Sequence, residues 1–263
     1  MKFKHLLIEQ RGPVRWIVLN RPEVKNAFNL ELGQELGHAV REALQDRKTA
    51  VVVLSGQGEV FSAGGDIKGM AQLKTSAQRK RFFLTISGLV HATILQIRQT
   101  PKPVLAAAPG YVGGVAFGLF LATDLRLASP NCHLSAATIH LGLVANGGAT
   151  FFLPRLVGLG RATELLFTGE KLAAPAALQM GLLQRVVPSE QLHETTQQLA
   201  EQLAASPRQA LGRLKQTLNK SGHRQLVTQL KKERKAIAWS ATTADFTEGV
   251  QAFLEKRRPR FQC

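Results

Sequence analysis

Two glycine-rich loops in this sequence each join an apolar stretch to a helical one. The loop "SAGGDIKGM" (residues 62–70) follows the run "VVVL", and the loop "GYVGGVAFG" (residues 110–118) follows "PVLAAA". Glycine lets a backbone approach a ligand closely, and the first N–H groups of a helix have no acceptor within the helix. Two such helix starts placed side by side could donate two hydrogen bonds to one oxygen. The pair therefore indicates an oxyanion hole, which stabilises a carbonyl oxygen that gains negative charge.

Each loop taken alone is open to a second interpretation, which is close packing of the backbone. Neither loop has the GxxxxGK[ST] pattern or the strand-linked GxGxxG pattern of phosphate-binding loops. The chemistry that the loops suggest therefore concerns a carbonyl group rather than a nucleotide phosphate.

The composition is that of a globular protein. The 263 residues are 44% hydrophobic and 20% charged, which is enough for one sizeable core. Cys132 and Cys263 are the only cysteines, so we expect no disulfide framework and a reducing, cytoplasmic location. No stretch reads as a signal peptide or a transmembrane segment, and no metal-ligand spacing is present.

The net charge of +16 favours anionic partners such as phosphorylated cofactors or acidic proteins. Aromatic residues make up only 6% of the chain, with a single Tyr, so stacking surfaces for bases are scarce. No nucleic-acid-binding motif is present. We therefore expect neither nucleic acid nor membrane as a partner.

Hydrophobic periodicity predicts strands and helices that alternate along most of the chain. We expect strands within residues 3–22, 49–56, 102–110 and 124–129, and helices over 28–47, 75–99 and 116–123. From about Gly160 onward the pattern predicts helices alone. Alternating elements of this kind favour parallel βαβ units. The predicted fold class is thus α/β, with a core over residues 1–200 and a dependent helical region over 201–263.

Five segments, in order, carry a family resemblance: "LNRPEVKNAFNLEL", "VFSAGGDIKGM", "PVLAAAPGYVGG", "GATFFLPRLVGLGRATELLFTGEKLAAPAALQMGLLQRVVP" and "TEGVQAFLEKRRPRF". Over essentially its whole length the chain resembles the enoyl-CoA hydratase/isomerase (crotonase) superfamily. The resemblance implies a crotonase-type ββα spiral core, a C-terminal trimerisation region and a homotrimer or hexamer. It also implies an acyl thioester held by two backbone N–H groups.

The resemblance assigns roles to particular positions. The oxyanion donors would be the N–H groups of Gly65 and Val115, with Gly114 replacing Val115 if the loop shifts by one residue. The thioester segment would comprise Ala63, Gly65, Asp66, Ile67 and Lys68. Coenzyme A would contact Lys25, Ala27 and Phe28, with Phe253 and Lys256 near the adenine end. Coenzyme A or phosphopantetheine would be part of the substrate, and no tightly bound cofactor is expected.

Hydratases of this family use two glutamates as general acid and base on one water. At the corresponding positions this chain has Gly118 and Thr138, the latter lining the substrate, and neither side chain can carry out that proton transfer. A third position used in other branches is Asn146, which could orient a water or serve a turn beside Gly147. His140 could act as acid and base or could be a structural histidine.

Several other polar residues have simpler interpretations. Asp66 is placed to cap the helix that follows it, Lys68 is as consistent with a solvated surface as with the thioester, and Cys132 has no activating neighbours. None of these residues supplies an obvious replacement for the two glutamates.

An oxyanion hole without glutamates suits a reaction in which the substrate provides the leaving group, such as decarboxylation of a thioester; double-bond isomerisation is the other expected reaction. The stretches "GLFLATDLRLAS" and "ASPRQALGRLK" are similar to crotonase-fold enzymes of polyketide β-branching, which act on acidic acyl carrier proteins. Ser240 stands where that branch has a histidine. The alternatives are an ordinary enoyl-CoA hydratase and a non-catalytic acyl-thioester-binding protein.

Overall fold

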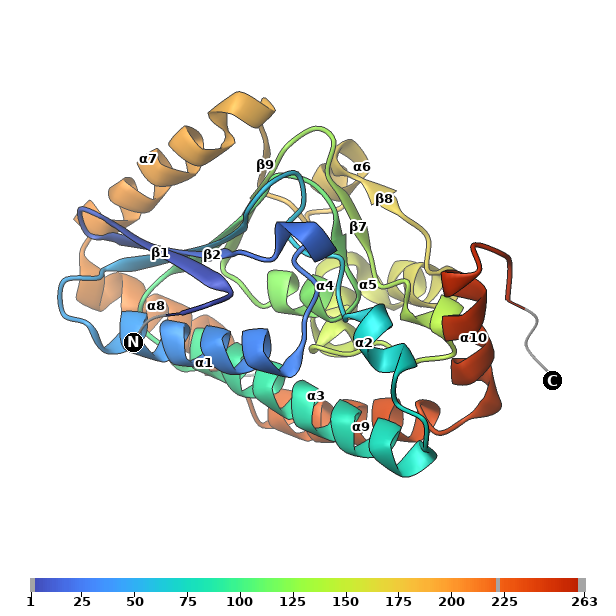
Figure 1. The fold of residues 1–263 in the computed structure, drawn as a ribbon. Coiled ribbons are helices and arrows are strands. Elements are labelled where there is room, and N and C mark those ends of the chain that lie inside the picture. Colours follow the sequence, from blue (N-terminus) through green and yellow to red (C-terminus); the bar gives the residue numbers. More distant parts are fainter. Residues whose placement is uncertain (1–2, 221–222, 260–263) are drawn as a thin grey trace.

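The computed structural model describes residues 3–220 and 223–259, and within them the chain forms two sheets surrounded by helices (Figure 1). The strands are β1 (Leu6–Arg11), β2 (Val14–Leu19), β3 (Val51–Gly56), β4 (Val104–Ala108), β5 (Val112–Gly113), β6 (Leu125–Ala128), β7 (His133–Ser135), β8 (Leu172–Ala173) and β9 (Arg185–Val186). The larger sheet has the order β1-β2-β3-β4-β6-β9, and the smaller has the order β5-β7-β8.

The helices supply the rest of the fold. They are α1 (Leu30–Gln45), α2 (Ile67–Ala71), α3 (Ser76–Gln99), α4 (Gly114–Leu121), α5 (Ala149–Thr168), α6 (Ala174–Gln179), α7 (Leu192–Ala205), α8 (Arg208–Lys220), α9 (His223–Ser240) and α10 (Ala244–Leu254). Short 3-10 turns occur at η1 (Pro22–Val24), η2 (Thr138–Leu141) and η3 (Ser189–Gln191).

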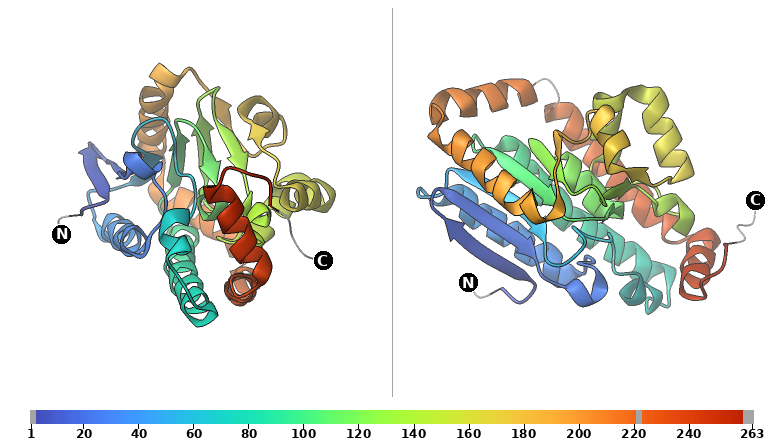
Figure 2. Two further views of the ribbon diagram at one scale, coloured as in Figure 1. Left: turned by 45° about the vertical axis from the view of Figure 1, so that its right-hand side comes forward. Right: turned by 90° about the horizontal axis from the view of Figure 1, so that it is seen from above.

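The central strands β3 and β4 of the larger sheet are buried on both faces. β1 and β2 form an antiparallel hairpin, and the strands from β2 onward pair in parallel. Along β3, Val52 and Leu54 pack with α1 and α3, whereas Val51 and Val53 pack with α7 on the other side. Figure 2 shows α7 lying across the sheet when the molecule is seen from above. Both faces of a covered parallel strand need apolar side chains, and this explains the uninterrupted "AVVVL" run.

The predicted α/β class and helical C-terminal region are confirmed, but the prediction of helices alone after Gly160 is wrong. Strands β8 and β9 interrupt that region, and β9 pairs in parallel with β6 at the edge of the larger sheet. Gly169 (φ 64°) and Gly181 (φ 76°) adopt the left-handed conformation that ends a helix, so the chain can turn into each short strand. Strands of two residues are too short to produce a periodic signal.

The C-terminal helices pack on the core rather than forming a separate body. Helix α9 runs along α3, and α10 contacts both η2 and α2. Lys215 of α8 donates to Asp124 at the start of β6, with 2.6 Å between the nitrogen and the carboxylate oxygen. None of the helices in the described residues is long and apolar enough to cross a bilayer.

Candidate active site

The two glycine loops lie against each other. The amide of Gly113 donates to the carbonyl of Ser62 over 2.9 Å, and the Ser62 amide donates to the carbonyl of Tyr111 over 3.2 Å. A Cβ atom on Gly64 would lie 2.9 Å from the carbonyl oxygen of Gly113. Since Cβ atoms essentially never come so close to a backbone oxygen, Gly64 (φ 97°) is required for this approach of the loops.

The amides named as oxyanion donors come from this junction. A Cβ on Gly114 would lie 3.9 Å from the Gly65 nitrogen and 3.9 Å from Cγ2 of Thr138. Among the described residues the Gly65 N–H has no hydrogen-bond partner, whereas the neighbouring Asp66 amide donates to Phe28 O over 3.0 Å. Val115 is the second residue of α4, so its N–H has no acceptor within that helix. Two amides free to donate thus lie on adjacent loops.

Helix α2 begins directly after Gly65. Asp66 is its N-cap: its carboxylate accepts from the Gly69 amide over 3.1 Å and from Nη2 of Arg21 over 3.2 Å. The cap predicted for Asp66 is therefore present. It directs Met70, which is 6% exposed, back over the loop, so that its methyl group stands 2.2 Å from where a Cβ of Gly65 would be. Met70 covers one side of the Gly65 amide.

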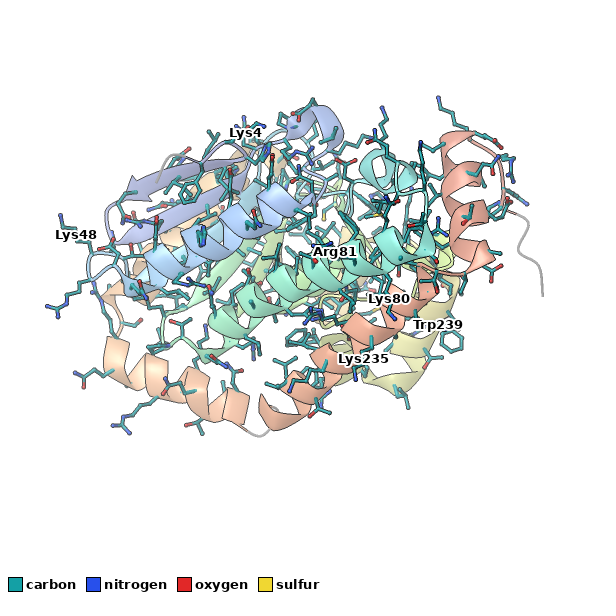
Figure 3. All side chains as sticks on the ribbon, turned by 60° about the horizontal axis from the view of Figure 1, so that its bottom comes forward. Lys4, Lys48, Lys80, Arg81, Lys235 and Trp239 are labelled. Carbon is teal, nitrogen blue, oxygen red and sulfur yellow. The ribbon has the colours of Figure 1, made fainter. Side chains whose placement is uncertain are left out.

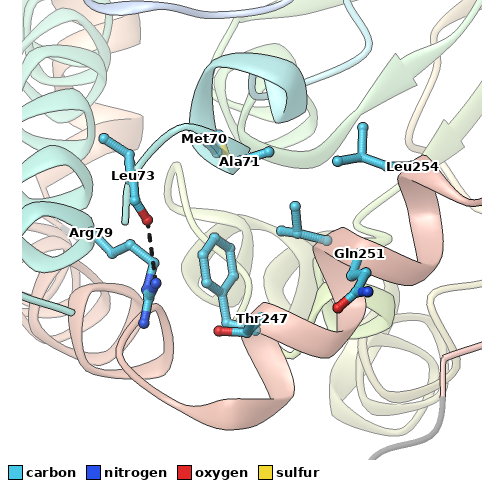
Figure 4. Close-up of a pocket in the computed structure, with 9 residues that line it drawn as sticks. Met70, Ala71, Leu73, Arg79, Thr247, Gln251 and Leu254 are labelled. Carbon is cyan, nitrogen blue, oxygen red and sulfur yellow. Dashed lines mark hydrogen bonds between the residues drawn. The ribbon is translucent and has the colours of Figure 1, made fainter. Parts of the chain in front are cut away.

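Beyond Met70 a mainly apolar cavity of about 270 Å³ lies between α2 and α10 (Figure 4). Its wall consists of Met70, Ala71, Leu73, Arg79, Phe246, Thr247, Val250, Gln251 and Leu254. Arg79 links two segments at the edge of this cavity. Its Nη1 donates to Leu73 O over 3.2 Å, and its Nε donates to Ala241 O over 2.8 Å.

Helix α10 also packs on η2, the turn that carries Thr138. A Cβ on Gly249 would lie 2.6 Å from Cα of Leu141, so the helix and the turn are in backbone contact. Thr138 is partly buried, and its hydroxyl donates to Ala136 O over 2.8 Å. Gly65, Gly114 and Thr138 therefore border one small region, with α2 and α10 at its side.

The segment assigned to coenzyme A is joined to the first loop through its backbone. The Phe28 amide donates to Gly64 O over 2.7 Å, and the Ala63 amide donates to Lys25 O over 2.9 Å. Lys25 is exposed and left-handed (φ 54°), whereas Ala27 is buried. The Phe28 ring is fully buried in the core, so this residue offers only backbone atoms to the loop.

Most of the remaining predicted contacts lie on the surface. Lys68 is exposed on α2, and Ile67 is partly buried and packs with Met70 and Phe83. Phe253 is 57% exposed near the end of α10, and Lys256 follows with φ 55°. His140 is exposed, and its Nε2 lies 2.7 Å from the Cβ position of Gly169, at the end of α5.

The space beside Gly118 is occupied by backbone. A Cβ on Gly118 would lie 2.2 Å from Gly147 O and 2.7 Å from Asn146 O. No side chain of any size fits there without movement of the turn formed by residues 146–148. A glutamate side chain at position 118, which is predicted to correspond to a hydratase glutamate, therefore has no room in this structure.

Asn146 lies in a buried hydrogen-bond network. It is 3% exposed; Oδ1 accepts from the Gly147 amide and from Nε2 of His91, each over 2.7 Å, and Nδ2 donates to the Ser87 hydroxyl over 2.7 Å. Gly147 (φ 65°) and Gly148 (φ 79°) adopt the left-handed conformation of the turn. The Asn146 side chain is thus committed to holding a turn that its neighbours form.

Sequence reasoning missed the other members of this network, His91 and Glu233. Glu233 of α9 is 3% exposed and accepts from the Gly148 amide over 2.8 Å. Two signals could have revealed them: Ser87 and His91 are polar residues one helical turn apart on an apolar face, and Glu233 is the single acid in the basic segment "KKERK".

Burial lowers the pKa of His91 to about 4, since the protonated imidazole would lose its hydration. In the unfolded chain the pKa is near 6.5, so the unfolded state binds more protons between these values. We predict that this residue removes about 3 kcal/mol of stability as pH falls from 7 to 4. Urea unfolding across this range should show a correspondingly smaller loss in His91→Gln.

The exposed His133 provides the control for this measurement. His133→Gln is expected to keep the wild-type pH dependence of the unfolding free energy. Equal pH dependence of His91→Gln and wild type would contradict the assignment of a low pKa to His91.

Within the described residues there is no group of three His, Cys, Asp or Glu side chains that could hold a metal ion. Cys132 is buried, and burial raises the pKa of its thiol to about 12, so it is a thiol rather than a thiolate at neutral pH.

Comparison with known proteins supports the same family. The enoyl-CoA hydratase/isomerase family model matches residues 9–263. The chain is 33% identical to trans-2-decenoyl-[acyl-carrier-protein] isomerase of Streptococcus mutans, over 99% of each chain. It is 34% identical to 1,2-epoxyphenylacetyl-CoA isomerase of Escherichia coli, over 94% of each.

A solved structure agrees with these relatives. An enoyl-CoA hydratase from Mycobacterium avium subsp. paratuberculosis superposes with a TM-score of 0.89 at 26% identity and covers 100% of both chains. The sequence match and the shared architecture extend over the paired loops as well as the helical C-terminal region. The chain therefore belongs to the enoyl-CoA hydratase/isomerase family.

Proposed function

We propose that this protein stabilises the enolate of an acyl thioester between the amides of Gly65 and Val115, and that it acts as an isomerase or a decarboxylase. The observation that carries the proposal is the approach of the two loops, with the Gly65 nitrogen 3.9 Å from the Cβ position of Gly114. Each correctly placed donor contributes roughly 3–4 kcal/mol of transition-state stabilisation. The Gly114 amide takes the place of Val115 if the substrate oxygen sits one residue earlier.

Both reactions pass through the same charged intermediate. In decarboxylation the electrons of the broken C–C bond enter the thioester enolate, CO₂ leaves, and a proton from solvent adds to the carbon. In isomerisation a base takes a proton from C2 of a 3-enoyl thioester, or from C4 of a 2-enoyl thioester, and a proton returns at the other of these two carbons. The common requirement is stabilisation of the negative oxygen, which backbone donors provide.

Glutamate-dependent hydration fits this chain less well. The backbone of residues 146–148 fills the space next to Gly118, and Thr138 has a hydroxyl engaged with Ala136 O. Similarity to two proteins named as isomerases favours isomerisation within the proposal. Hydration stays the second candidate because a short-chain-enoyl-CoA hydratase of Clostridium acetobutylicum is 30% identical over 98% of this chain.

The net charge and the relatives bear on the carrier of the acyl group. The net charge of +16 suits both the phosphates of coenzyme A and an acidic carrier protein. The Streptococcus relative is named for an acyl-carrier-protein substrate and the Escherichia relative for a CoA substrate. We propose a CoA or phosphopantetheine thioester as substrate, a homotrimer or hexamer as the assembly, and no further cofactor.

The experiment that tests this function is a mass-spectrometric screen of purified protein. Crotonyl, 3-enoyl, and glutaconyl or malonyl thioesters would be supplied both on coenzyme A and on a carrier protein. A mass loss of CO₂, or a shifted double bond located by chromatography, would support the proposal. Rapid hydration of the crotonyl thioester would overturn it, and binding without turnover of any thioester would favour a non-catalytic binder.

Met70 is expected to limit acyl chain length. Its methyl group lies beside Gly65 and its side chain lines the 270 Å³ cavity, so we expect a short acyl chain to end at Met70 and a longer one to displace it. In Met70→Ala we predict that the kcat/KM ratio of a ten-carbon to a four-carbon substrate rises about tenfold. Leu254→Ala, at the same cavity but away from Gly65, is the control and should change this ratio little. An unchanged ratio in Met70→Ala would contradict this role.

A further inference from the structure

We infer that Glu233, Asn146 and His91 are positioning residues that hold the first turn of α4, and with it the Val115 amide, in place for the substrate oxygen. This inference rests on the proposed function and adds residues to it that do not touch substrate. Its starting point is a buried carboxylate on α9, in the helical C-terminal region, which the chemistry at the two loops does not use.

Glu233 fixes the beginning of α5. One carboxylate oxygen accepts from the Gly148 amide over 2.8 Å, and the other accepts from the Thr150 hydroxyl. Gly148 is the N-cap of α5, where a negative charge meets the unpaired N–H groups and the positive end of the helix dipole. The carboxylate thus holds the start of α5 by the amide of its N-cap residue and by the Thr150 side chain.

Asn146 and His91 fix the residue before that cap. Because the Gly147 amide must donate, the atom that it contacts is the carbonyl oxygen of Asn146, and the amide nitrogen must then face Ser87. His91 contacts the same carbonyl oxygen through Nε2, which therefore carries the proton. That Nε2 also lies 4.0 Å from a Glu233 carboxylate oxygen, so His91 and Glu233 lie next to each other at the turn.

Backbone contacts with the turn fix the position of α4. A Cβ on Gly147 would lie 2.6 Å from Val115 O and 3.4 Å from Val115 Cγ2. The contacts of Gly118 with Gly147 O and Asn146 O lie one helical turn further along. Because no side chains lie between them, the turn and the helix cannot move independently. A displacement of the turn would therefore also displace the start of α4.

The helix α9, which carries Glu233, is itself attached to the core. Helix α9 packs along α3, and Nε of Arg234 donates to Leu84 O over 2.7 Å. Figure 3 shows Lys80, Arg81, Lys235 and Trp239 on the outer side of these two helices. Glu233 is turned the other way, into the protein, and this orientation is what allows the C-terminal helix to reach the turn beside α4.

The test uses acetoacetyl-CoA, whose enolate absorbs in the near ultraviolet, so that enolate formation is read without knowledge of the natural reaction. Bound to wild-type protein, the thioester should show an increased enolate fraction. In Glu233→Gln we expect an enolate-to-keto ratio about tenfold lower, since misplaced donors lose most of their effect. Total affinity, measured by calorimetry, should change less than twofold. Glu233→Ala, which leaves the Gly148 amide without an acceptor, should show a larger loss.

Gln197→Leu is the matched control. It removes a buried hydrogen bond of 2.7 Å, from Trp16 Nε1 to Gln197, in the layer formed by α7 on the far side of the sheet. It should lower the melting temperature as Glu233→Gln does, yet keep the wild-type enolate fraction. Equal enolate fractions in Glu233→Gln and Gln197→Leu would overturn the positioning role. Failure of the wild type to bind the thioester or to increase its enolate fraction would instead overturn the proposed function.

Discussion

Replacing Gly114 by Ala is expected to lower kcat/KM on a thioester substrate by roughly 100-fold, which is the loss produced by disabling one oxyanion donor in other enzymes. The new Cβ would lie 3.4 Å from Cα of Gly64 and 3.9 Å from the Gly65 nitrogen, so the protein can accommodate it. The methyl group would nevertheless stand between the two loops, where the substrate oxygen has to sit. Steady-state kinetics and thermal unfolding of the same preparation would measure both effects.

Backbone strain needs its own control, because Gly114 has φ 53° and a residue with a side chain costs roughly 1–2 kcal/mol in that region. Gly12 has φ 55° and nothing within 4 Å of its Cβ position, so Gly12→Ala carries similar strain with no new contact. We expect both variants to lose similar stability and only Gly114→Ala to lose activity. Wild-type activity in Gly114→Ala would remove the support for an oxyanion hole at this junction.

The second large effect concerns stability. Gly118→Ala is predicted to destabilise the protein by about 3 kcal/mol or more, because the added methyl group meets backbone rather than a movable side chain. Its Cβ position lies 2.2 Å from Gly147 O. Gly118→Glu, which places a glutamate at the position predicted to correspond to a hydratase glutamate, should not fold to the same structure. Urea unfolding would measure the alanine variant, and near-ultraviolet circular dichroism would report on the glutamate variant.

Gly160 provides the comparison for this prediction. It lies in α5 and has nothing within 4 Å of its Cβ position, so Gly160→Ala is expected to be neutral or to stabilise by up to about 1 kcal/mol. A Gly118→Ala variant as stable as Gly160→Ala would show that the 146–148 turn moves easily. The exclusion of a carboxylate at position 118 would then lose its basis.

Much of the fold could be predicted because its signals are local. The hairpin around Gly12, the helix of residues 30–45 and the strand of residues 51–56 occur where periodicity and turn residues place them. The prediction failed after Gly160, where β8 and β9 are two residues long and are held by pairing with distant strands. Short strands of this kind depend on their partners more than on their own side chains.

The candidate site divides in the same way. Glycine content and the apolar runs before it identify both loops, and residue identity alone shows that positions 118 and 138 lack carboxylates. The ring of Phe28 is fully buried, because its place in the strand-like bridge to Gly65 turns the side chain into the core, and its position near coenzyme A stays a prediction. The trimeric or hexameric assembly and the nucleotide contacts of Phe253 and Lys256 stay predictions.

By itself, the amino-acid sequence determined most of the helices and strands before Gly160, which loops are rich in glycine, and which ionisable groups are missing, since each of these depends on neighbours within a few residues. Only the tertiary structure decided that Gly64 touches Gly113, that backbone fills the space beside Gly118, and that Glu233 reaches a turn 85 positions earlier. Contacts between such distant residues arise from the packing of whole elements, and no local pattern encodes them.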